Sequence, residues 1–244
     1  MPIPPPITQE FGTVECVQIL RTVRHGGMQP LLCTADDNAR YVVKPFSSGG
    51  AWPQVLEWVC ARLGRSLGLP IPNYRQIMIG EELADAWNAT NARQVEPGLG
   101  FGSQFVEGAS ECDEALLVRI EPTLTHRLRA FDWWIRNRDR ILKNPNLLWS
   151  YGEARPYVID HEQAGQTDGA DAFWRDHLFA NATPTPWLPA DLRSEMQVAL
   201  LLKPNILAEL PSTWTTGTDG VDWFFKQLEH SIATTPHPDW RNYE

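Results

Sequence analysis

Apolar and polar residues alternate along the first part of the chain, which is the pattern of short β-strands. Within residues 11–22, Val14 and Cys16 fall on one face. Two further runs, 31–34 and 40–44, each follow a segment rich in turn-forming residues. Three short strands joined by turns predict a small antiparallel sheet.

An amphipathic helix is predicted over residues 52–67, because its apolar residues recur at spacings of 4, 3 and 4. Gly68 favours the end of this helix. After it we expect a strand over 69–79, a polar loop over 81–100 and another strand over 101–106.

The rest of the chain has mostly helical patterns. One apolar stripe again shows spacings of 4, 3 and 4 and consists of Leu124, Leu128, Phe131 and Ile135. That helix leads directly into Asn137. A β-hairpin is expected from the apolar runs 147–149 and 157–159. Further helical patterns cover residues 172–180, 189–203 and 219–233.

The polar residues between this helix and the hairpin carry a distinctive arrangement. Asp139 and Asn144 lie five positions apart, and Asp160 follows the second strand of the hairpin. In kinases, an Asp accepts the proton of the attacking hydroxyl, while an Asn at this spacing and a later Asp hold metal ions on the nucleotide phosphates. The predicted hairpin places Asn144 before one strand and Asp160 after the other, so both can reach one metal.

Residues upstream extend this arrangement in kinase order. Lys44 ends a predicted strand, as does the kinase lysine that pairs with nucleotide phosphates. Glu57 lies on the following helix, and Glu107 with Gly108 ends the last strand of the sheet, where a kinase hinge binds adenine through its backbone.

Each of these residues has a simpler interpretation. Taken alone, Lys44 is a solvated edge lysine, Glu57 an exposed helix carboxylate, and Asn144 a turn residue beside Pro145. Asp160 could likewise be a turn residue at a strand end. Their occurrence in one order favours the kinase interpretation.

Two features stay open at the level of sequence. The phosphate-covering loop is either the turn at Gly26-Gly27 or the segment 47–50. One of the two arginines that flank Asp139 can fix the loop by pairing with Asp132 or Asp160.

Together these segments resemble the HipA-like kinases, bacterial members of the protein-kinase-like superfamily. The resemblance covers residues 13–165 and is most specific over 131–161, which includes Ile159-Asp160-His161. It implies an α+β, bilobed protein-kinase-like fold. The small antiparallel-sheet N-lobe with one helix would span 1–107, and a mainly helical C-lobe 108–244.

The resemblance also implies roles for individual residues. Lys44 would bind the α- and β-phosphates of ATP, with Glu57 as its partner. Asp139 would be the catalytic base, and Asn144 and Asp160 would ligate Mg²⁺. The implied cofactors are therefore ATP and Mg²⁺.

Composition narrows the partners. The chain has 244 residues, 43% of them hydrophobic, and a net charge of −9. Without a basic block, this charge argues against nucleic acid or an anionic membrane as a partner. No apolar run approaches a membrane span, and the N-terminus lacks the features of a signal peptide. The four scattered cysteines predict neither a zinc site nor a disulfide framework, so we expect a cytoplasmic protein.

The sequence therefore predicts an ATP-dependent phosphotransferase that acts on a hydroxyl. The alternative is a catalytically silent kinase-fold module that binds a nucleotide or a protein. The acceptor stays open among protein hydroxyls such as Ser or Thr, lipid headgroups and small metabolites.

Overall fold

The chain folds into two compact units that interleave along the sequence. The computed structural model describes residues 12–23, 29–48, 50–166, 176–180, 190–216 and 219–233. The barrel unit consists of Met1–Gln54, Pro72–Val106 and Pro211–Thr216. The helical unit consists of Val55–Ile71, Glu107–Leu210 and Gly217–Glu244.

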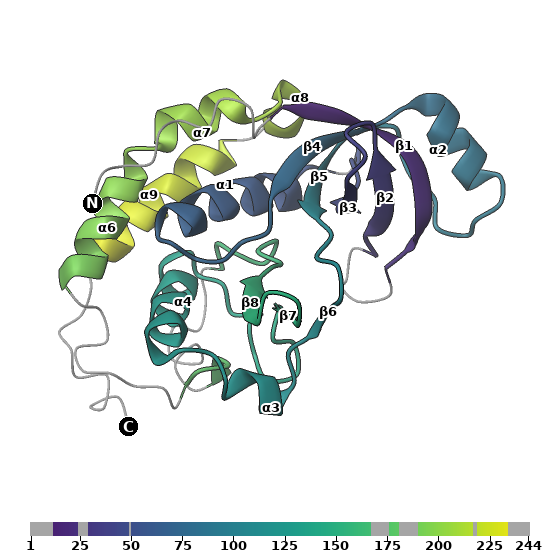
Figure 1. The fold of residues 1–244 in the computed structure, drawn as a ribbon. Coiled ribbons are helices and arrows are strands. Elements are labelled where there is room, and N and C mark those ends of the chain that lie inside the picture. Colours follow the sequence, from purple (N-terminus) through teal and green to yellow (C-terminus); the bar gives the residue numbers. More distant parts are fainter. Residues whose placement is uncertain are drawn as a thin grey trace. The chain divides into compact units, whose positions relative to one another are not determined.

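Five strands of the barrel unit close into a barrel with the order β1-β2-β3-β5-β4 (Figure 1). The strands are β1 Thr13–Thr22, β2 Leu31–Ala35, β3 Arg40–Lys44, β4 Tyr74–Ile79 and β5 Gly98–Gln104. The antiparallel pairing expected for β1, β2 and β3 is present. A purely antiparallel sheet is wrong, however, because β1 also pairs in parallel with β4. This second pairing satisfies an edge of β1 that an open sheet would leave unpaired.

Two glycines of β5 allow the barrel strands to approach closely. A Cβ atom at Gly102 would lie 2.3 Å from Cγ1 of Ile77 on β4. At Gly100 it would lie 2.6 Å from the carbonyl oxygen of Lys44. Larger residues would push these strands apart. The end of β3, and with it Lys44, is therefore packed directly on β5.

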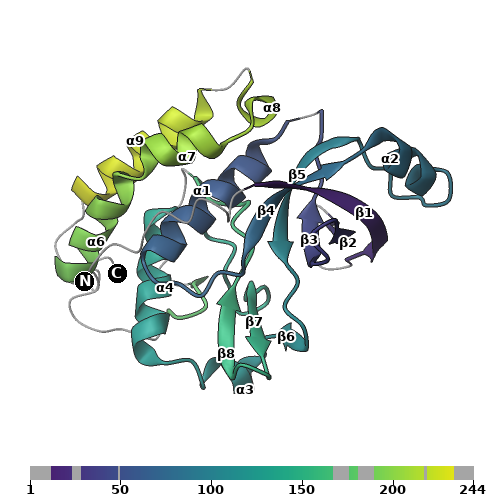
Figure 2. The ribbon, with the colours of Figure 1, turned by 45° about the horizontal axis from the view of Figure 1, so that its top comes forward.

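The loop expected over 81–100 is wrong in its first part, because α2 Glu81–Asn88 is helical. Leu83, Ala84 and Trp87 pack on the barrel core, and α2 contacts β1 (Figure 2). Two glutamates in its first turn suit the helix dipole. Helix α2 forms because its short apolar face packs on the rest of the barrel unit.

A late segment of the sequence completes the barrel unit. Helix α8 Ser212–Thr215 carries Trp214, which is buried. The Nε1–H of Trp214 donates to the carbonyl oxygen of Leu99 on β5 over 2.8 Å.

In its described residues, the helical unit is built mainly on helices, with one small sheet. Its helices are α1 Trp52–Ser66, whose first residues belong to the barrel unit, α3 Glu114–Leu117, α4 Pro122–Trp134, α6 Ala190–Leu200, α7 Lys203–Glu209 and α9 Gly220–Ala233. The expected hairpin is confirmed by β7 Leu147–Ser150 and β8 Arg155–Val158, which β6 Ala109–Glu111 extends. Trp134 and Phe225 lie in the core, and Trp134 Nε1–H donates to the carbonyl oxygen of Leu228. Most of the pattern expected over 172–180 lies outside the described residues.

The predicted division into 1–107 and 108–244, and the bilobed arrangement, stay predictions. The two units change over between Val106 and Glu107. A single boundary does not describe the two units, because Val55–Ile71 belongs to the helical unit and Pro211–Thr216 belongs to the barrel unit.

The four cysteines are all buried and free. In the part of the chain that the structure describes, no helix combines the length and the apolar character needed to cross a membrane.

Candidate active site

The candidate active site begins where α4 ends. Arg136 has a positive φ of 55°, and the helix closes in a Schellman motif. Its two bonds run from the N–H of Asn137 to the carbonyl oxygen of Asp132 over 2.8 Å, and from the N–H of Arg136 to that of Trp133 over 3.2 Å. This turn sets the direction of the chain into the loop that carries Asp139.

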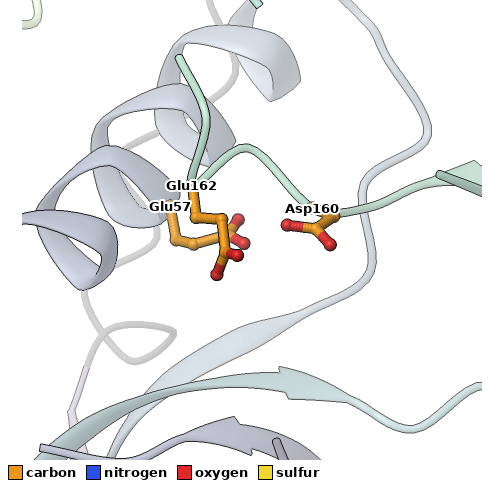
Figure 3. A group of neighbouring side chains, drawn as sticks. All are labelled: Glu57, Asp160 and Glu162. Atoms are coloured by element: carbon orange, nitrogen blue, oxygen red, sulfur yellow. The ribbon is translucent and has the colours of Figure 1, made fainter. Parts of the chain in front are cut away.

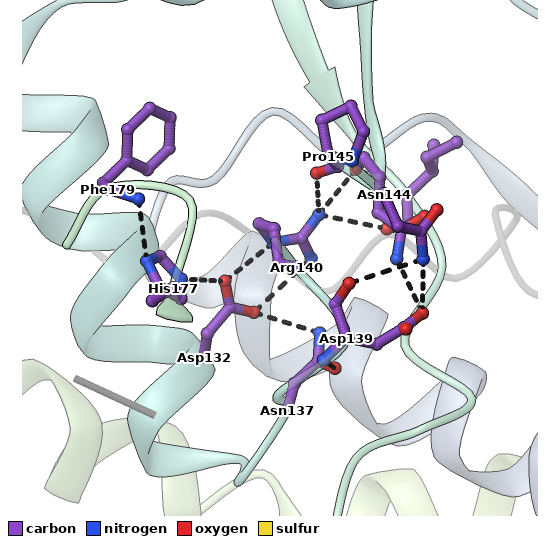
Figure 4. Close-up of polar contacts among 10 residues, drawn as sticks. Asp132, Asn137, Asp139, Arg140, Asn144, Pro145, His177 and Phe179 are labelled. Atoms are coloured by element: carbon purple, nitrogen blue, oxygen red, sulfur yellow. Dashed lines mark hydrogen bonds and ion pairs between the residues drawn. The ribbon is translucent and has the colours of Figure 1, made fainter. Parts of the chain in front are cut away.

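Two amide side chains hold the carboxylate of Asp139 (Figure 4). The Nδ2 atom of Asn144 donates to Oδ2 of Asp139 over 2.7 Å. The Nδ2 atom of Asn146 donates to the same oxygen over 3.0 Å. Asp139 is partly exposed, so its carboxylate is oriented by the protein and still accessible. With Nδ2 of Asn144 committed to Asp139, its Oδ1 atom points elsewhere and can serve as a metal ligand.

Asn146 was not among the predicted site residues. It is buried and has a φ of 48°, a conformation that Asn tolerates better than most residues. The Asn-Pro-Asn sequence in which it stands indicated a turn, but it gave no sign that this amide would reach Asp139.

The hairpin β7–β8 fixes the position of Asp160 relative to the loop. The N–H of Ile159 donates to the carbonyl oxygen of Asn146 over 3.1 Å, so the two ends of the hairpin are joined at its base. Asp160 follows with a φ of 62°. Five residues later, the N–H of Gly165 donates to the carbonyl oxygen of Ile135 at the end of α4 over 2.8 Å. The segment that carries Asp160 is therefore anchored at both ends.

Three carboxylates, two of them on this segment, lie close together (Figure 3). Glu57 of α1, Asp160 and Glu162 each place an oxygen so that all three lie within 4.8 Å of one another. Carboxylate oxygens are the ligands that Mg²⁺ prefers, so the donor set suits a hard divalent cation. Glu162 was missed by the sequence prediction, since a single Glu two residues after an Asp has no special pattern.

Glu57 has a further neighbour on the same segment. Nδ1 of His161 lies 3.3 Å from Oε2 of Glu57, and both side chains are buried. The interpretation of Glu57 as an exposed helix carboxylate is therefore wrong. His161 packs edge-on against Phe131.

A buried polar network lies under the loop. Nε of Arg140 is 2.7 Å from Oδ2 of Asp132, and neither side chain is exposed. Of the two partners expected for a loop arginine, the structure therefore pairs Arg140 with Asp132. Nε2 of His177 lies 3.0 Å from the same oxygen. Burial alone would raise the pKa of Asp132, but Arg140 and His177 outweigh it and hold that pKa below its usual value.

His177 is held as the neutral imidazole. Its Nδ1 accepts a hydrogen bond from the N–H of Phe179 over 3.1 Å, so Nδ1 carries no proton. Nε2 is then the protonated nitrogen that donates to Asp132. Burial lowers the pKa of His177, although Asp132 acts in the opposite direction.

The remaining predicted residues belong to other parts of the fold. Lys44 ends β3 in the barrel unit, where it is 8% exposed, so it is not a solvated edge lysine. Glu107 begins a segment of the helical unit, next to Gly108 with a φ of 62°. Their predicted roles toward ATP stay predictions.

The structure describes only part of the two segments that were candidates for the phosphate-covering loop. Gly26-Gly27 lies outside the described residues, as does Gly49 of the segment 47–50. In that second segment, the N–H of Ser48 donates to a carboxylate oxygen of Glu96 over 2.8 Å. Hydrogen bonds from Ser48 lower the pKa of Glu96. A carboxylate thus uses a donor that a phosphate would need.

Comparisons with known proteins bear on the family and the fold of this chain. A family model described as HipA-like kinase matches residues 16–242. A search of curated proteins finds no significant match. The crystal structure of the Helicobacter pylori proinflammatory kinase CtkA aligns with 90% of this chain and 93% of its own, at 12% identity and a TM-score of 0.53. A Golgi casein kinase aligns with 91% of this chain and 71% of its own, at 11% identity and a TM-score of 0.45. The likeness to CtkA shows a kinase-like α+β fold.

Proposed function

The chain belongs to the HipA-like kinase family, and from this premise we propose that it transfers the γ-phosphoryl group of ATP to a hydroxyl. The observation that carries the proposal is the orientation of Asp139, whose Oδ2 accepts from Asn144 over 2.7 Å and from Asn146 over 3.0 Å. A carboxylate held in this way can accept the proton of an attacking hydroxyl. In phosphoryl transfer, most of the protein's work is such positioning.

The proposed metal ligands are Asn144 and Asp160. Support for this assignment comes from the chemistry around Asp160, because Glu57 and Glu162 bring two more carboxylates within 4.8 Å. Three like charges so close together repel one another, and a divalent cation among them would offset that repulsion. Mg²⁺ bound there would neutralise charge on the phosphates of the nucleotide.

The nucleotide contacts are proposed from the order of the motifs. Lys44 would pair with the α- and β-phosphates, Glu57 would steady Lys44, and the backbone around Glu107 would bind adenine. The low exposure of Lys44, 8%, supports a role that requires a fixed position. A buried ammonium group needs a partner of opposite charge.

A labelling experiment tests the proposal. The full chain is incubated with γ-labelled ATP and Mg²⁺, alone, with a dephosphorylated protein mixture, with lipid vesicles and with small alcohols. We propose a protein Ser or Thr as the acceptor, so label should appear on protein and depend on Mg²⁺. Binding of ATP–Mg²⁺ without transfer to any acceptor would identify a silent nucleotide-binding module instead. Absence of both binding and transfer would refute the proposal.

A further inference from the structure

We propose that Arg140 is a positioning residue, which sets the spacing between the base Asp139 and the metal ligand Asp160. The proposal rests on the proposed phosphotransfer function and adds a residue that touches neither substrate nor metal. Its basis is the set of groups that the guanidinium of Arg140 binds inside the helical unit (Figure 4).

One edge of the guanidinium joins the two segments that carry the site. Nη1 of Arg140 donates to the carbonyl oxygen of Asn146 over 2.5 Å and to that of Ile159 over 3.4 Å. A third acceptor is the carbonyl oxygen of Pro145, at 3.3 Å. Asn146 is the residue whose amide holds Asp139, and Ile159 immediately precedes Asp160. A single nitrogen therefore fixes both ends of the hairpin base.

The other edge of the guanidinium is anchored to α4. Nε donates to Oδ2 of Asp132 over 2.7 Å, and Nη2 to Oδ1 over 3.4 Å. Asp132 is held in turn by Nδ2 of Asn137 at 3.2 Å and by Nε2 of His177 at 3.0 Å. The carboxylate thus has donors on both oxygens and cannot rotate without breaking several bonds. Arg140 is therefore anchored to α4 as well as to the base of the hairpin.

Stability alone does not account for this arrangement. Apolar residues of similar volume often replace a buried ion pair with no loss of stability. An arginine differs from them by its planar fork, which places several N–H groups in fixed directions. Here the N–H groups donate to a carboxylate on one side and to carbonyl groups of two chain segments on the other. The arrangement is suited to fix distances between segments.

Lysine is the informative substitution. Arg140→Lys keeps the charge next to Asp132, but one ammonium cannot reach Asp132 and both Asn146 and Ile159. The segments that carry Asp139 and Asp160 then lose their common tie. Misplacement of reacting groups by about 1 Å can cost on the order of 10²-fold in rate. We expect kcat to fall by about that factor, and Mn²⁺ affinity, measured by calorimetry, to fall about tenfold because Asp160 shifts.

A matched control separates positioning from general destabilisation. Arg62 also pairs through its guanidinium, with Nη2 donating to Oε1 of Glu209 over 3.0 Å, and this pair joins α1 to α7. Arg62→Lys should lower the melting temperature and leave kcat and Mn²⁺ affinity at wild-type values. His177→Gln, which keeps an N–H near Asp132 but loses the Phe179 bond, should fold and give a smaller loss of kcat.

The double variant Arg140→Lys/Asp160→Asn supplies the decisive readout. If Arg140 acts on the metal through Asp160, then Arg140→Lys should have no further effect on Mn²⁺ affinity once Asp160 is replaced. Additive losses would show that Arg140 affects the metal by a route other than Asp160, which would overturn the proposed control of the Asp139–Asp160 spacing.

The outcomes distinguish the two proposals. If the wild-type chain transfers phosphate and folded Arg140→Lys keeps its kcat and Mn²⁺ affinity, the positioning role is overturned and the proposed function stands. If Arg140→Lys does not fold, unchanged kcat in His177→Gln overturns the role. If the wild-type chain neither binds Mn²⁺ with ATP nor transfers phosphate, the proposed function fails and this inference fails with it.

Discussion

Asn144 and Asp139 share a hydrogen bond of 2.7 Å from the amide nitrogen of one to the carboxylate of the other. The bond determines the direction of both side chains. The carboxylate of Asp139 is turned so that its second oxygen can face a hydroxyl, while the amide oxygen of Asn144 is turned away from Asp139. One contact thereby links the proposed base to a proposed metal ligand, and it gives the mutations below different expected signatures.

Replacing the base should remove catalysis and preserve binding. Asp139→Asn keeps the shape of the side chain but cannot accept a proton, so we expect transfer to fall by about 10²-fold to 10⁴-fold. Affinity for ATP–Mg²⁺ should change little, because Asp139 is not a proposed ligand of the metal. Both are measured on one preparation, by label transfer and by calorimetry. Full transfer activity in this variant would exclude Asp139 as the base.

Replacing the metal ligand should weaken binding and catalysis together. Asp160→Asn removes a negative charge from a site that would hold a hard cation, and Mg²⁺ prefers carboxylate oxygen. Calorimetry with ATP–Mg²⁺ should show weaker binding, and transfer should fall in parallel. Glu162→Gln, in the same carboxylate cluster, should show a smaller loss of metal affinity. Equal metal affinity in Asp160→Asn and in the wild type would show that the metal does not bind at this cluster.

Asn146 allows side-chain and backbone effects to be separated. Asn146→Gly removes the amide that binds Asp139 and easily adopts the φ of 48°, so it should lower kcat with little loss of stability. Asn146→Ala also removes the amide, but at this φ it should lose about 1–2 kcal/mol of stability in addition. Denaturant unfolding and initial rates on both variants provide the comparison. Wild-type kcat in Asn146→Gly would show that Asn144 alone suffices to orient Asp139.

His177 predicts a pH dependence of stability. Its pKa in the folded protein lies below the ordinary value, so it stays neutral where the unfolded chain already binds a proton. Stability should therefore be fully present above about pH 6.5 and decline as the pH falls below it, since the unfolded state takes up the proton first. Unfolding by denaturant between about pH 7.5 and pH 5 should show this decline, and His177→Gln should make it shallower.

A second histidine contributes to the same pH dependence of stability. Burial and the neighbouring Arg129 and Arg127 also lower the pKa of His126, so His126 acts in the same direction. His126→Gln should flatten part of the curve, and the double variant more than either single one. A curve that keeps its full slope in His177→Gln would mean that the imidazole of His177 is not neutral in the folded protein.

The sequence was most informative where chemistry requires particular residues at particular spacings. Asp139, Asn144 and Asp160 could be selected because the hairpin between them was visible as two apolar runs. Asn146 and Glu162 could not, because each is a single polar residue whose neighbours are set only when the hairpin closes. His177 is 45 residues from Asp132, and no local pattern predicts such a contact.

The fold shows the same division between local and distant effects. Helix α1 and helix α4 followed from long apolar stripes. Helix α2 did not, because its eight residues are stabilised by packing on β1. The parallel pairing of β1 with β4 joins segments far apart in the sequence, so alternation within each strand could not reveal it. Arg136 adopts the positive φ that glycine usually supplies at the end of a helix, so the sequence had no glycine to mark the end of α4.

The contact between Trp214 and Leu99 has a consequence for the order in which this protein can fold during synthesis. The two residues are 115 positions apart, and the last barrel strand ends at Gln104. Domains generally fold as they leave the ribosome, N-terminal parts first. Here all five strands emerge long before the tryptophan that covers part of them. A nascent chain must therefore carry the five barrel strands without this contact until Trp214 has been translated. A fragment that ends at residue 210 would never gain the donor that Trp214 supplies to the carbonyl oxygen of Leu99.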